Sequence, residues 1–150
     1  MASGILLQPE FVIAQVRQDP DDPLLATLND FLTETDTDYY PCLSAMSYGL
    51  VQAALLSSAK LTDNERQELR QRLRTLRRGL DKDGAFFVLD AEAADEYAVV
   101  RNRCRDDKIA LDAERQVEYG IALAKCPAIL APSTQQQVYL KYPSLIIEYR

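Results

Sequence analysis

Two acids near the carboxyl end of the chain, Asp112 and Glu114, are the first residues whose type and spacing point to chemistry. They open an amphipathic run in which apolar residues recur at the spacing of one helix face, at Ala113, Val117, Gly120, Ile121 and Ala124. The pair thus places two carboxylates at the N-terminal end of one helix, which makes it a candidate site. The alternative is that the acids only favour the positive end of the helix dipole, a contribution of up to about 1 kcal/mol.

A second pair of polar residues, Gln8 and Glu10, directly follows a short apolar segment at residues 4–7. The segment is typical of a strand, and Pro9 is well placed at the start of the helix that follows. Sites on open α/β sheets lie just beyond the carboxyl ends of strands. Gln8 and Glu10 are therefore further candidates, with helix capping again as the alternative.

A row of arginines spaced by four residues would share one face of a helix. The row consists of Arg66, Arg70, Arg74 and Arg78, with Arg72 and Arg77 beside it. Such a ridge can contact the phosphates of RNA. The alternative is a solvated face that pairs with neighbouring acids or with an acidic partner, and the net charge of −6 favours this alternative. The row is a predicted RNA or partner surface.

The hydrophobic pattern predicts that strands and helices alternate along the whole chain. Strand candidates lie at residues 4–7, 39–43, 86–89, 128–131 and 145–147. With the helices between them, the expected order is β α α β α α β α α β β, and a turn at Pro143 and Ser144 precedes the last strand. Because most links between strands are helical crossovers, we expect a mainly parallel sheet in a three-layer α/β/α domain. Residues 1–150 are expected to form a single domain.

The helix that carries the arginines has a clear start and a clear apolar face. Thr62, with Glu65 three residues later, forms a capping box. A leucine stripe follows at Leu69, Leu73, Leu76 and Leu80. The preceding helix begins near Ser44 and is apolar almost throughout, so we expect it to be mostly buried.

Composition excludes several classes of protein. The chain has 150 residues and no histidine, which excludes histidine metal sites, Ser-His-Asp triads and histidine bases. The cysteines, Cys42, Cys104 and Cys126, lack metal-type spacing and are expected to be buried, reduced thiols. No run approaches the roughly 18 apolar residues of a membrane span, and the N-terminus lacks the features of a secretory signal. We expect a cytoplasmic protein with no membrane association and no small-molecule cofactor.

Three segments resemble the motifs of a known family. Residues 6–10 read LLQPE, residues 44–51 read SAMSYGLV and residues 112–119 read DAERQVEY. They are similar, in order, to Leu-Leu-Asp-Thr-Asn, Ser-Ala-(hydrophobic)-Thr-x-x-Glu-Leu and Asp-x-Asp-x-x-Ile-Ala-Ala of the PIN-domain family. The members meant are of the kind found in VapC-type bacterial toxins, and the resemblance covers essentially the whole chain.

This resemblance implies metal-dependent cleavage of RNA, with carboxylates that converge at one edge of the sheet and hold magnesium or manganese. Compared with the family motifs, Gln8 replaces the first acid and Leu50 replaces the second, whereas Asp112 and Glu114 keep acids at the third. The implied metal ligands are Asp112, Glu114 and Gln8. The implied catalytic residues are Asp112, Glu114 and Glu10.

With most of its acids replaced, the chain is expected to be a degenerate PIN-like domain with little or no nuclease activity. It would act by binding RNA or a protein partner such as an antitoxin, as a homodimer. One alternative is an active magnesium- or manganese-dependent endoribonuclease of the toxin type. Another is a structural interaction module that uses the leucine-striped helix, residues 61–80, as a dimer or partner surface.

Overall fold

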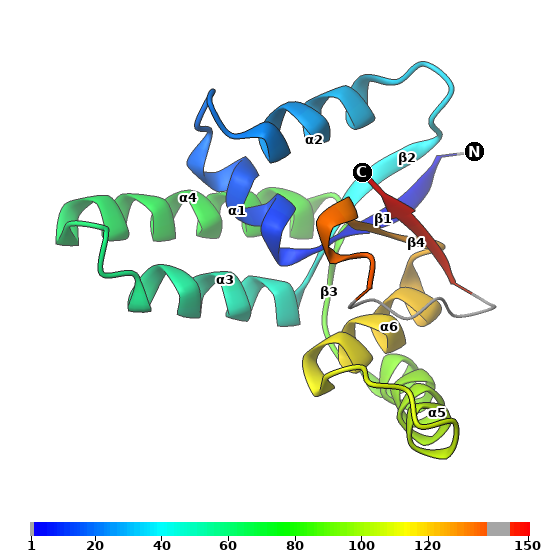
Figure 1. Cartoon of the computed structure of the whole chain (residues 1–150). Helices are drawn as coiled ribbons and strands as arrows, with labels where there is room; N and C mark the ends of the chain where they lie inside the picture. Colours follow the sequence, from blue (N-terminus) through cyan, green and yellow to red (C-terminus); the bar gives the residue numbers. More distant parts are fainter. Residues whose placement is uncertain (1, 138–144) are drawn as a thin grey trace.

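A computed structural model describes residues 2–137 and 145–150 and shows a parallel sheet with helices on both faces (Figure 1). The strands are β1 (Ser3–Leu7), β2 (Tyr39–Ser44), β3 (Phe86–Phe87), β4 (Ala128–Ala131) and β5 (Ile146–Tyr149). Their order across the five-stranded sheet is β3-β2-β1-β4-β5, and each neighbouring pair is parallel. The predicted α/β class is confirmed.

The helices occupy the predicted places between the strands. They are α1 (Pro9–Arg17), α2 (Pro23–Thr33), α3 (Ala45–Ser57), α4 (Asp63–Lys82), α5 (Ala91–Asp106) and α6 (Ala113–Lys125), with a short 3-10 helix, η1 (Ser133–Gln135), after β4. The element order matches the sequence-based prediction. The turn predicted at Pro143 and Ser144 lies outside the described residues. Within the described ranges, no helix has the length and apolar character needed to cross a membrane.

The central strand β1 shows how the two faces of the sheet are filled. Successive side chains of a strand point to opposite faces. Ile5 and Leu7 pack in a cluster with residues of the four N-terminal helices, whereas Leu6 packs in a second cluster with residues of α5 and α6. Both faces of β1 are therefore buried, which explains its apolar sequence.

The leucine stripe of α4 packs inside the chain. Leu73 is fully buried, and Leu69, Leu76 and Leu80 pack against the same core cluster. The capping box at Thr62 and Glu65 is present as predicted. The stripe itself is therefore covered inside the chain, but most of the other α4 side chains are exposed, so the use of residues 61–80 as a dimer or partner surface stays a prediction. The leucines serve the core because α4 lies against α3 and α1.

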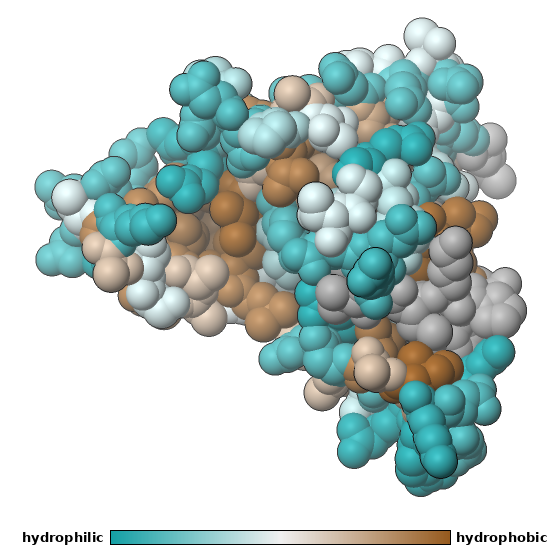
Figure 2. All heavy atoms as spheres, viewed as in Figure 1, coloured by the Kyte–Doolittle hydropathy of each residue, from teal (hydrophilic) through white to brown (hydrophobic). Residues whose placement is uncertain are grey.

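The helix α3 departs from its predicted burial. Val51 and Leu55 are buried, but Ala53, Ala54 and Leu56 are exposed, Leu56 with 54% of its surface. The helix is apolar around its circumference, so burial of one side leaves an apolar side facing solvent. Figure 2 shows this apolar surface as a brown to pale band over α3.

The strand β3 is shorter than predicted. Only Phe86 and Phe87 pair with β2, and the next two residues, Val88 and Leu89, are 53% and 45% exposed. β3 forms one edge of the sheet, and short edge strands limit unwanted pairing with other chains. The chain leaves the sheet at Val88 and enters α5 at Asp90, whose side chain accepts a hydrogen bond from the backbone N–H of Ala93 at 2.9 Å.

The helices α5 and α6 approach each other at a glycine. A Cβ atom at Gly120 would lie only 2.8 Å from the backbone of Tyr97, so a side chain at this position would force the helices apart. The cysteines Cys42, Cys104 and Cys126 are free and buried, as predicted.

Candidate functional site

The polar side chains that the fold brings together lie where β1 and β2 end. These strands are parallel neighbours, so their carboxyl ends meet at one edge of the sheet. Gln8 follows β1 directly and is fully buried, and its backbone N–H donates to the carbonyl of Leu130 at 3.1 Å. Ser44 ends β2 and is also fully buried. The candidate site is therefore built on the central strand β1 and its neighbour β2.

A buried acid on α6, Glu118, faces this edge. Glu118 is 1% exposed and accepts a hydrogen bond from the hydroxyl of Ser47 on α3 at 3.1 Å. The backbone N–H of Ser47 in turn donates to the hydroxyl of Ser44 at 2.9 Å. A continuous polar path thus joins the end of β2, the first turn of α3 and the middle of α6.

The protonation of Glu118 reflects its surroundings. Burial raises the pKa of its carboxyl to about 7, against the hydrogen bond from Ser47, the nearby Gln8 amide and the charge of Arg115, while the charge of Glu10 adds to the rise. Five side chains from α1, α3, α6 and the end of β1 therefore act on one another electrostatically. Near neutral pH, the Glu118 carboxyl is poised between its neutral and charged forms.

Several polar atoms of this cluster have no hydrogen-bond partner among the described residues. They are the Nε2 and Oε1 atoms of Gln8, the Oε2 atom of Glu10 and the Oε2 atom of Glu118. Buried polar atoms in proteins are nearly always hydrogen-bonded, because an unpaired buried group costs about 1–3 kcal/mol. Unmet hydrogen-bonding capacity at the carboxyl edge of a parallel sheet is the expected signature of a ligand site. We call Gln8, Glu10, Ser47, Arg115 and Glu118 the sheet-edge cluster.

The structure places the first predicted acid pair outside the sheet-edge cluster. Asp112 caps α6, and its side chain accepts a hydrogen bond from the backbone N–H of Arg115 at 2.9 Å and forms an ion pair with the Arg115 guanidinium. Glu114 is exposed in the first turn of the same helix. Of the predicted site residues, Gln8 and Glu10 lie beside Glu118, whereas Asp112 and Glu114 lie at the N-terminal end of α6, as the alternative of a helix-dipole contribution also requires.

The described residues do not fit the magnesium or manganese centre that the resemblance implies. Hard divalent cations require several anionic oxygens. Within the described ranges, no group of three or more cysteine, aspartate or glutamate side chains could hold a metal ion. The sheet-edge cluster has two carboxylates, Glu10 and Glu118, and the positive charge of Arg115 lies close to Glu118. An amide at Gln8 supplies an oxygen but no charge.

The sequence-based prediction missed Glu118 and Ser47, although one signal pointed to Glu118. The third family motif has an acid three residues before Ile-Ala, and the chain contains Ile121 and Ala122. Counting back from Ile121 gives Glu118 rather than Asp112 or Glu114. The hydrophobic pattern hid this register, because Glu118 lies between Val117 and Tyr119 in a largely apolar stretch.

Comparison with known proteins shows the fold. No protein-family profile matches the chain, and no curated protein sequence matches it. Among solved structures, VapBC2 from Rickettsia felis bound to a promoter DNA fragment matches with a TM-score of 0.69 and 13% identity, over 98% of each chain. FitAcB from Neisseria gonorrhoeae matches with a TM-score of 0.64 and 19% identity, over 85% of this chain and 86% of that one.

A third structure agrees with these two. VapBC-5 from Mycobacterium tuberculosis, described as a member of a family of toxin–antitoxin systems, matches with a TM-score of 0.62 and 13% identity over 99% of each chain. At such low identity the match establishes the architecture alone. The chain has the PIN-like fold of these toxin–antitoxin structures, as the resemblance in sequence predicts.

Proposed function

We propose that this chain is a single PIN-like domain that acts by binding a protein partner of the antitoxin type, with little or no nuclease activity. The observation that carries the proposal is the composition of the sheet-edge cluster. Glu118 is its one acid buried to 1% exposure, and an amide, Gln8, stands beside it. Metal-dependent cleavage of RNA needs several carboxylates around its cations, and the site lacks them.

A second feature supports a protein partner. The exposed side of α3 carries Ala53, Ala54 and Leu56, and an apolar helix face open to solvent is typical of an interaction surface. Solved structures with this fold include complexes described as VapBC and FitAB assemblies. A second copy of the chain is the competing occupant of this face.

An RNA-cleavage assay and manganese calorimetry test the loss of nuclease activity. We expect the wild type to show neither cleavage nor manganese binding. A double variant, Gln8→Asp/Leu50→Glu, restores the first two acids of the family motifs, and we expect it to gain manganese affinity. Cleavage by the wild type that disappears in Glu118→Gln would overturn the proposal in favour of a toxin-type endoribonuclease.

A parallel variant addresses the predicted acid pair. In Asp112→Asn/Glu114→Gln, manganese binding should not differ from the wild type, since Asp112 is held by the Arg115 guanidinium and Glu114 is exposed to solvent. Loss of binding and cleavage in this variant, but not in Glu118→Gln, would instead assign the metal site to Asp112 and Glu114.

The partner surface is tested by Leu56→Asp, which places a charge on the exposed apolar side of α3. The variant should lose affinity for a protein partner of the antitoxin type, and sedimentation of the wild type and the variant should give the same oligomeric state. A wild-type dimer that Leu56→Asp dissociates would assign the face to a second copy instead.

A further inference from the structure

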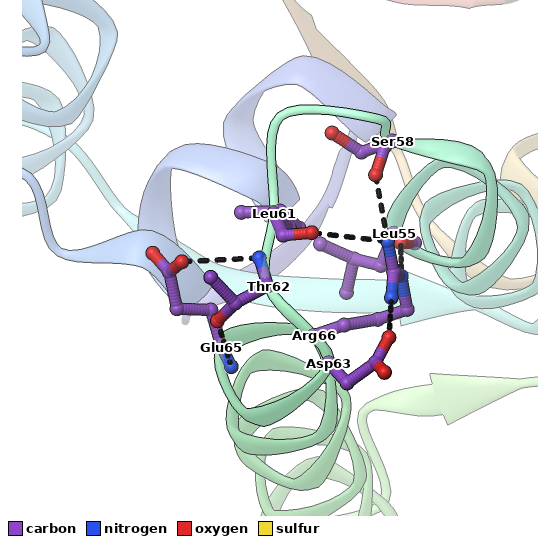
Figure 3. A network of polar contacts seen from close by, with 7 residues as sticks. All are labelled: Leu55, Ser58, Leu61, Thr62, Asp63, Glu65 and Arg66. Carbon is purple, nitrogen blue, oxygen red and sulfur yellow. Dashed lines mark hydrogen bonds and ion pairs between the residues drawn. The ribbon is translucent and has the colours of Figure 1, made fainter.

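Two groups of side chains outside the sheet-edge cluster could bind a ligand, and the predicted row of arginines on α4 is the first. Arg66 is used by the fold, because its guanidinium pairs with Asp63 at 2.8 Å and donates to three backbone carbonyls at the end of α3 and in the loop that follows (Figure 3). Arg70 and Arg74 donate to the amide oxygens of two glutamines, and Arg78 is exposed. The row stays a predicted RNA or partner surface.

The second group is a pair of buried cysteines. Cys42 lies on β2 with 0% of its surface exposed, and Cys126 lies between α6 and β4 with 5% exposed. Both side chains pack in the core cluster on the α5 and α6 face of the sheet. The strand β1 separates β2 from β4, so the two cysteines approach each other across β1. Their wide separation along the sequence hides this pair.

The absence of a side chain at Gly4, on β1, allows the two sulfur atoms to come together. A Cβ atom at Gly4 would lie 2.7 Å from the Sγ atom of Cys42 and 3.4 Å from the Sγ atom of Cys126. The first distance is too short for a carbon–sulfur contact, so any side chain at this position would displace the Cys42 sulfur. The φ of Gly4 is not positive, so its backbone conformation does not require glycine. The glycine thus leaves a space that both sulfur atoms border.

The two thiols also act on each other electrostatically, and the third cysteine has no such neighbour. The hydrogen bond with Cys126 lowers the pKa of the Cys42 thiol, although burial opposes this effect. The same hydrogen bond, together with burial, raises the pKa of the Cys126 thiol. Burial raises the pKa of the Cys104 thiol, whose other influences are the charges of Arg103 and Asp107. Cys104 is therefore a buried cysteine without a sulfur partner.

The chemistry of the pair favours a soft ion with a low coordination number. Thiolates bind both zinc and Cu(I). A structural zinc ion takes four ligands, and within the described ranges no group of three or more cysteine, aspartate or glutamate side chains could hold a metal ion. Cu(I) accepts two sulfur ligands in a near-linear arrangement. With metal–sulfur bonds of about 2.3 Å, the two sulfur atoms are then roughly 4 to 5 Å apart.

A disulfide is the competing chemistry for two thiols, and the sheet opposes it. A disulfide requires Cα atoms within about 7 Å of each other. Neighbouring strands are about 4.8 Å apart, so β2 and β4 are separated by about 10 Å. A direct bond between the sulfur atoms would therefore require the backbone to move. An ion between the sulfur atoms spans a longer distance and does not.

The ring of Tyr40 borders the same space from the solvent side. Its Cζ atom would lie 3.5 Å from a Cβ atom at Gly4, and Tyr40 is 41% exposed. Burial and the charges of the two thiols raise the pKa of the Tyr40 hydroxyl. One partly exposed side chain thus covers the pair, and rotation of such side chains is fast enough to admit an ion.

We propose that Cys42 and Cys126 form a two-coordinate site for Cu(I) in the space left by Gly4. The ion forms one bond to each sulfur atom, and each thiol releases its proton to solvent. The site borders the second residue of β1, whereas the sheet-edge cluster begins after the last residue of this strand. Its ligands are not part of the sheet-edge cluster, so the proposal is independent of the proposed function.

Competition with the Cu(I) chelator bicinchoninate, without oxygen and without added thiols, tests this site. We expect the reduced wild type to withdraw one Cu(I) ion per chain from the chelator. Cys42→Ser and Cys126→Ser each remove one soft ligand, and we expect each to lower the affinity about a hundredfold or more. The matched control is Cys104→Ser, the same chemical change at the third buried cysteine, which should leave the affinity within about threefold of the wild type.

A second variant tests the space while keeping both sulfur atoms. Gly4→Ala places a methyl group against the Cys42 sulfur, and we expect Cu(I) affinity to fall at least about tenfold. Gly79→Ala is the control, because a Cβ atom there would meet nothing within 4 Å. Wild-type affinity in Gly4→Ala would overturn the proposal, as would equal losses in Cys104→Ser and the two ligand variants.

The wild type alone supplies the remaining decisive outcome. Absence of Cu(I) binding by the reduced wild type would overturn the proposal. If that protein instead formed a disulfide between Cys42 and Cys126 on oxidation, detected by mass spectrometry of its peptides, the pair would be assigned to redox chemistry rather than to an ion.

Discussion

Two polar regions of the molecule differ in how fully their hydrogen bonds are satisfied. One is the Arg66 network, in which the guanidinium on α4 donates to the backbone carbonyls of Leu55, Ser58 and Leu61 (Figure 3). The other is the sheet-edge cluster. Arg66 finds four oxygen partners within 3.2 Å, and its side chain remains 21% exposed. Among the described residues, Glu118, which is 1% exposed, accepts a hydrogen bond from the hydroxyl of Ser47 through one carboxylate oxygen, while its other oxygen and the Gln8 amide have no partner.

The two regions therefore show two different consequences of enclosing polar groups in a protein. A saturated network stabilises the native state, because removing it would leave carbonyls without donors. An unsaturated cluster costs stability and persists where a ligand completes it. We therefore expect substitutions in the two regions to change the free energy of unfolding in opposite directions.

The largest expected effect comes from Glu118 and depends on pH. Its pKa is raised from 4.5 to about 7 in the folded state, so the folded state binds the proton more tightly than the unfolded state. The contribution of Glu118 protonation to the free energy of unfolding is therefore fully present below the pKa of the unfolded state and is lost as the pH rises through about 7. The loss amounts to roughly 3 kcal/mol, at 1.36 kcal/mol for each pKa unit.

Urea denaturation at about pH 4 and about pH 8 measures this loss against Glu118→Gln, whose amide does not titrate. The variant should gain roughly 3 kcal/mol relative to the wild type between the two pH values. An equal pH dependence in both proteins would show that Glu118 is solvated or paired in the folded state.

Arg66→Met gives the next largest effect. The change keeps the apolar stem but removes the donors to Leu55, Ser58 and Leu61, and we expect a loss of about 2 kcal/mol in the free energy of unfolding. Arg78→Met is the control, because Arg78 is exposed on the same helix and should change stability by less than about 0.5 kcal/mol. Similar losses in both variants would remove the distinction between the two arginines.

Gln8→Leu gives the smallest effect and the opposite sign. Replacing a buried amide that lacks partners with an apolar group of similar size should stabilise the fold by about 1 kcal/mol, measured near pH 5 where Glu118 is neutral. Gln52→Leu is the matched control, since the Gln52 amide bonds both Tyr48 and Arg70, and its loss should destabilise. Destabilisation by Gln8→Leu would mean that the sheet-edge cluster is saturated after all.

The order of elements could be predicted because each rests on a local pattern. The apolar run at residues 128–131 is buried on both faces as β4, and the Thr62 and Glu65 pair forms the capping box that its spacing predicts. Such signals need no knowledge of distant parts of the chain. Exposure of α3 could not be predicted in the same way, because an apolar helix is expected to be covered on all sides.

The candidate site was only partly predictable from the residues. Gln8 follows from its place after a strand, which is a local argument, and it lies in the sheet-edge cluster. Glu118 required knowing which turn of α6 faces the sheet edge. Asp112 and Glu114 stand out in the sequence because they are acids at the start of a helix. In the structure this helix start is exposed, so neither carboxylate lies among the buried groups of the sheet-edge cluster.

The close approach of α5 and α6 at Gly120 also governs the position of Glu118, which lies two residues earlier on the same helix. Because a Cβ at Gly120 would meet the backbone of Tyr97 at 2.8 Å, even a single methyl group would push α6 away from α5. That displacement would also move the Glu118 carboxyl with respect to the Ser47 hydroxyl, which donates a hydrogen bond to it. The absence of a side chain at Gly120, on the opposite side of α6, therefore helps to set the geometry of the sheet edge. A substitution there would change the distances within the sheet-edge cluster although Gly120 is not one of its residues.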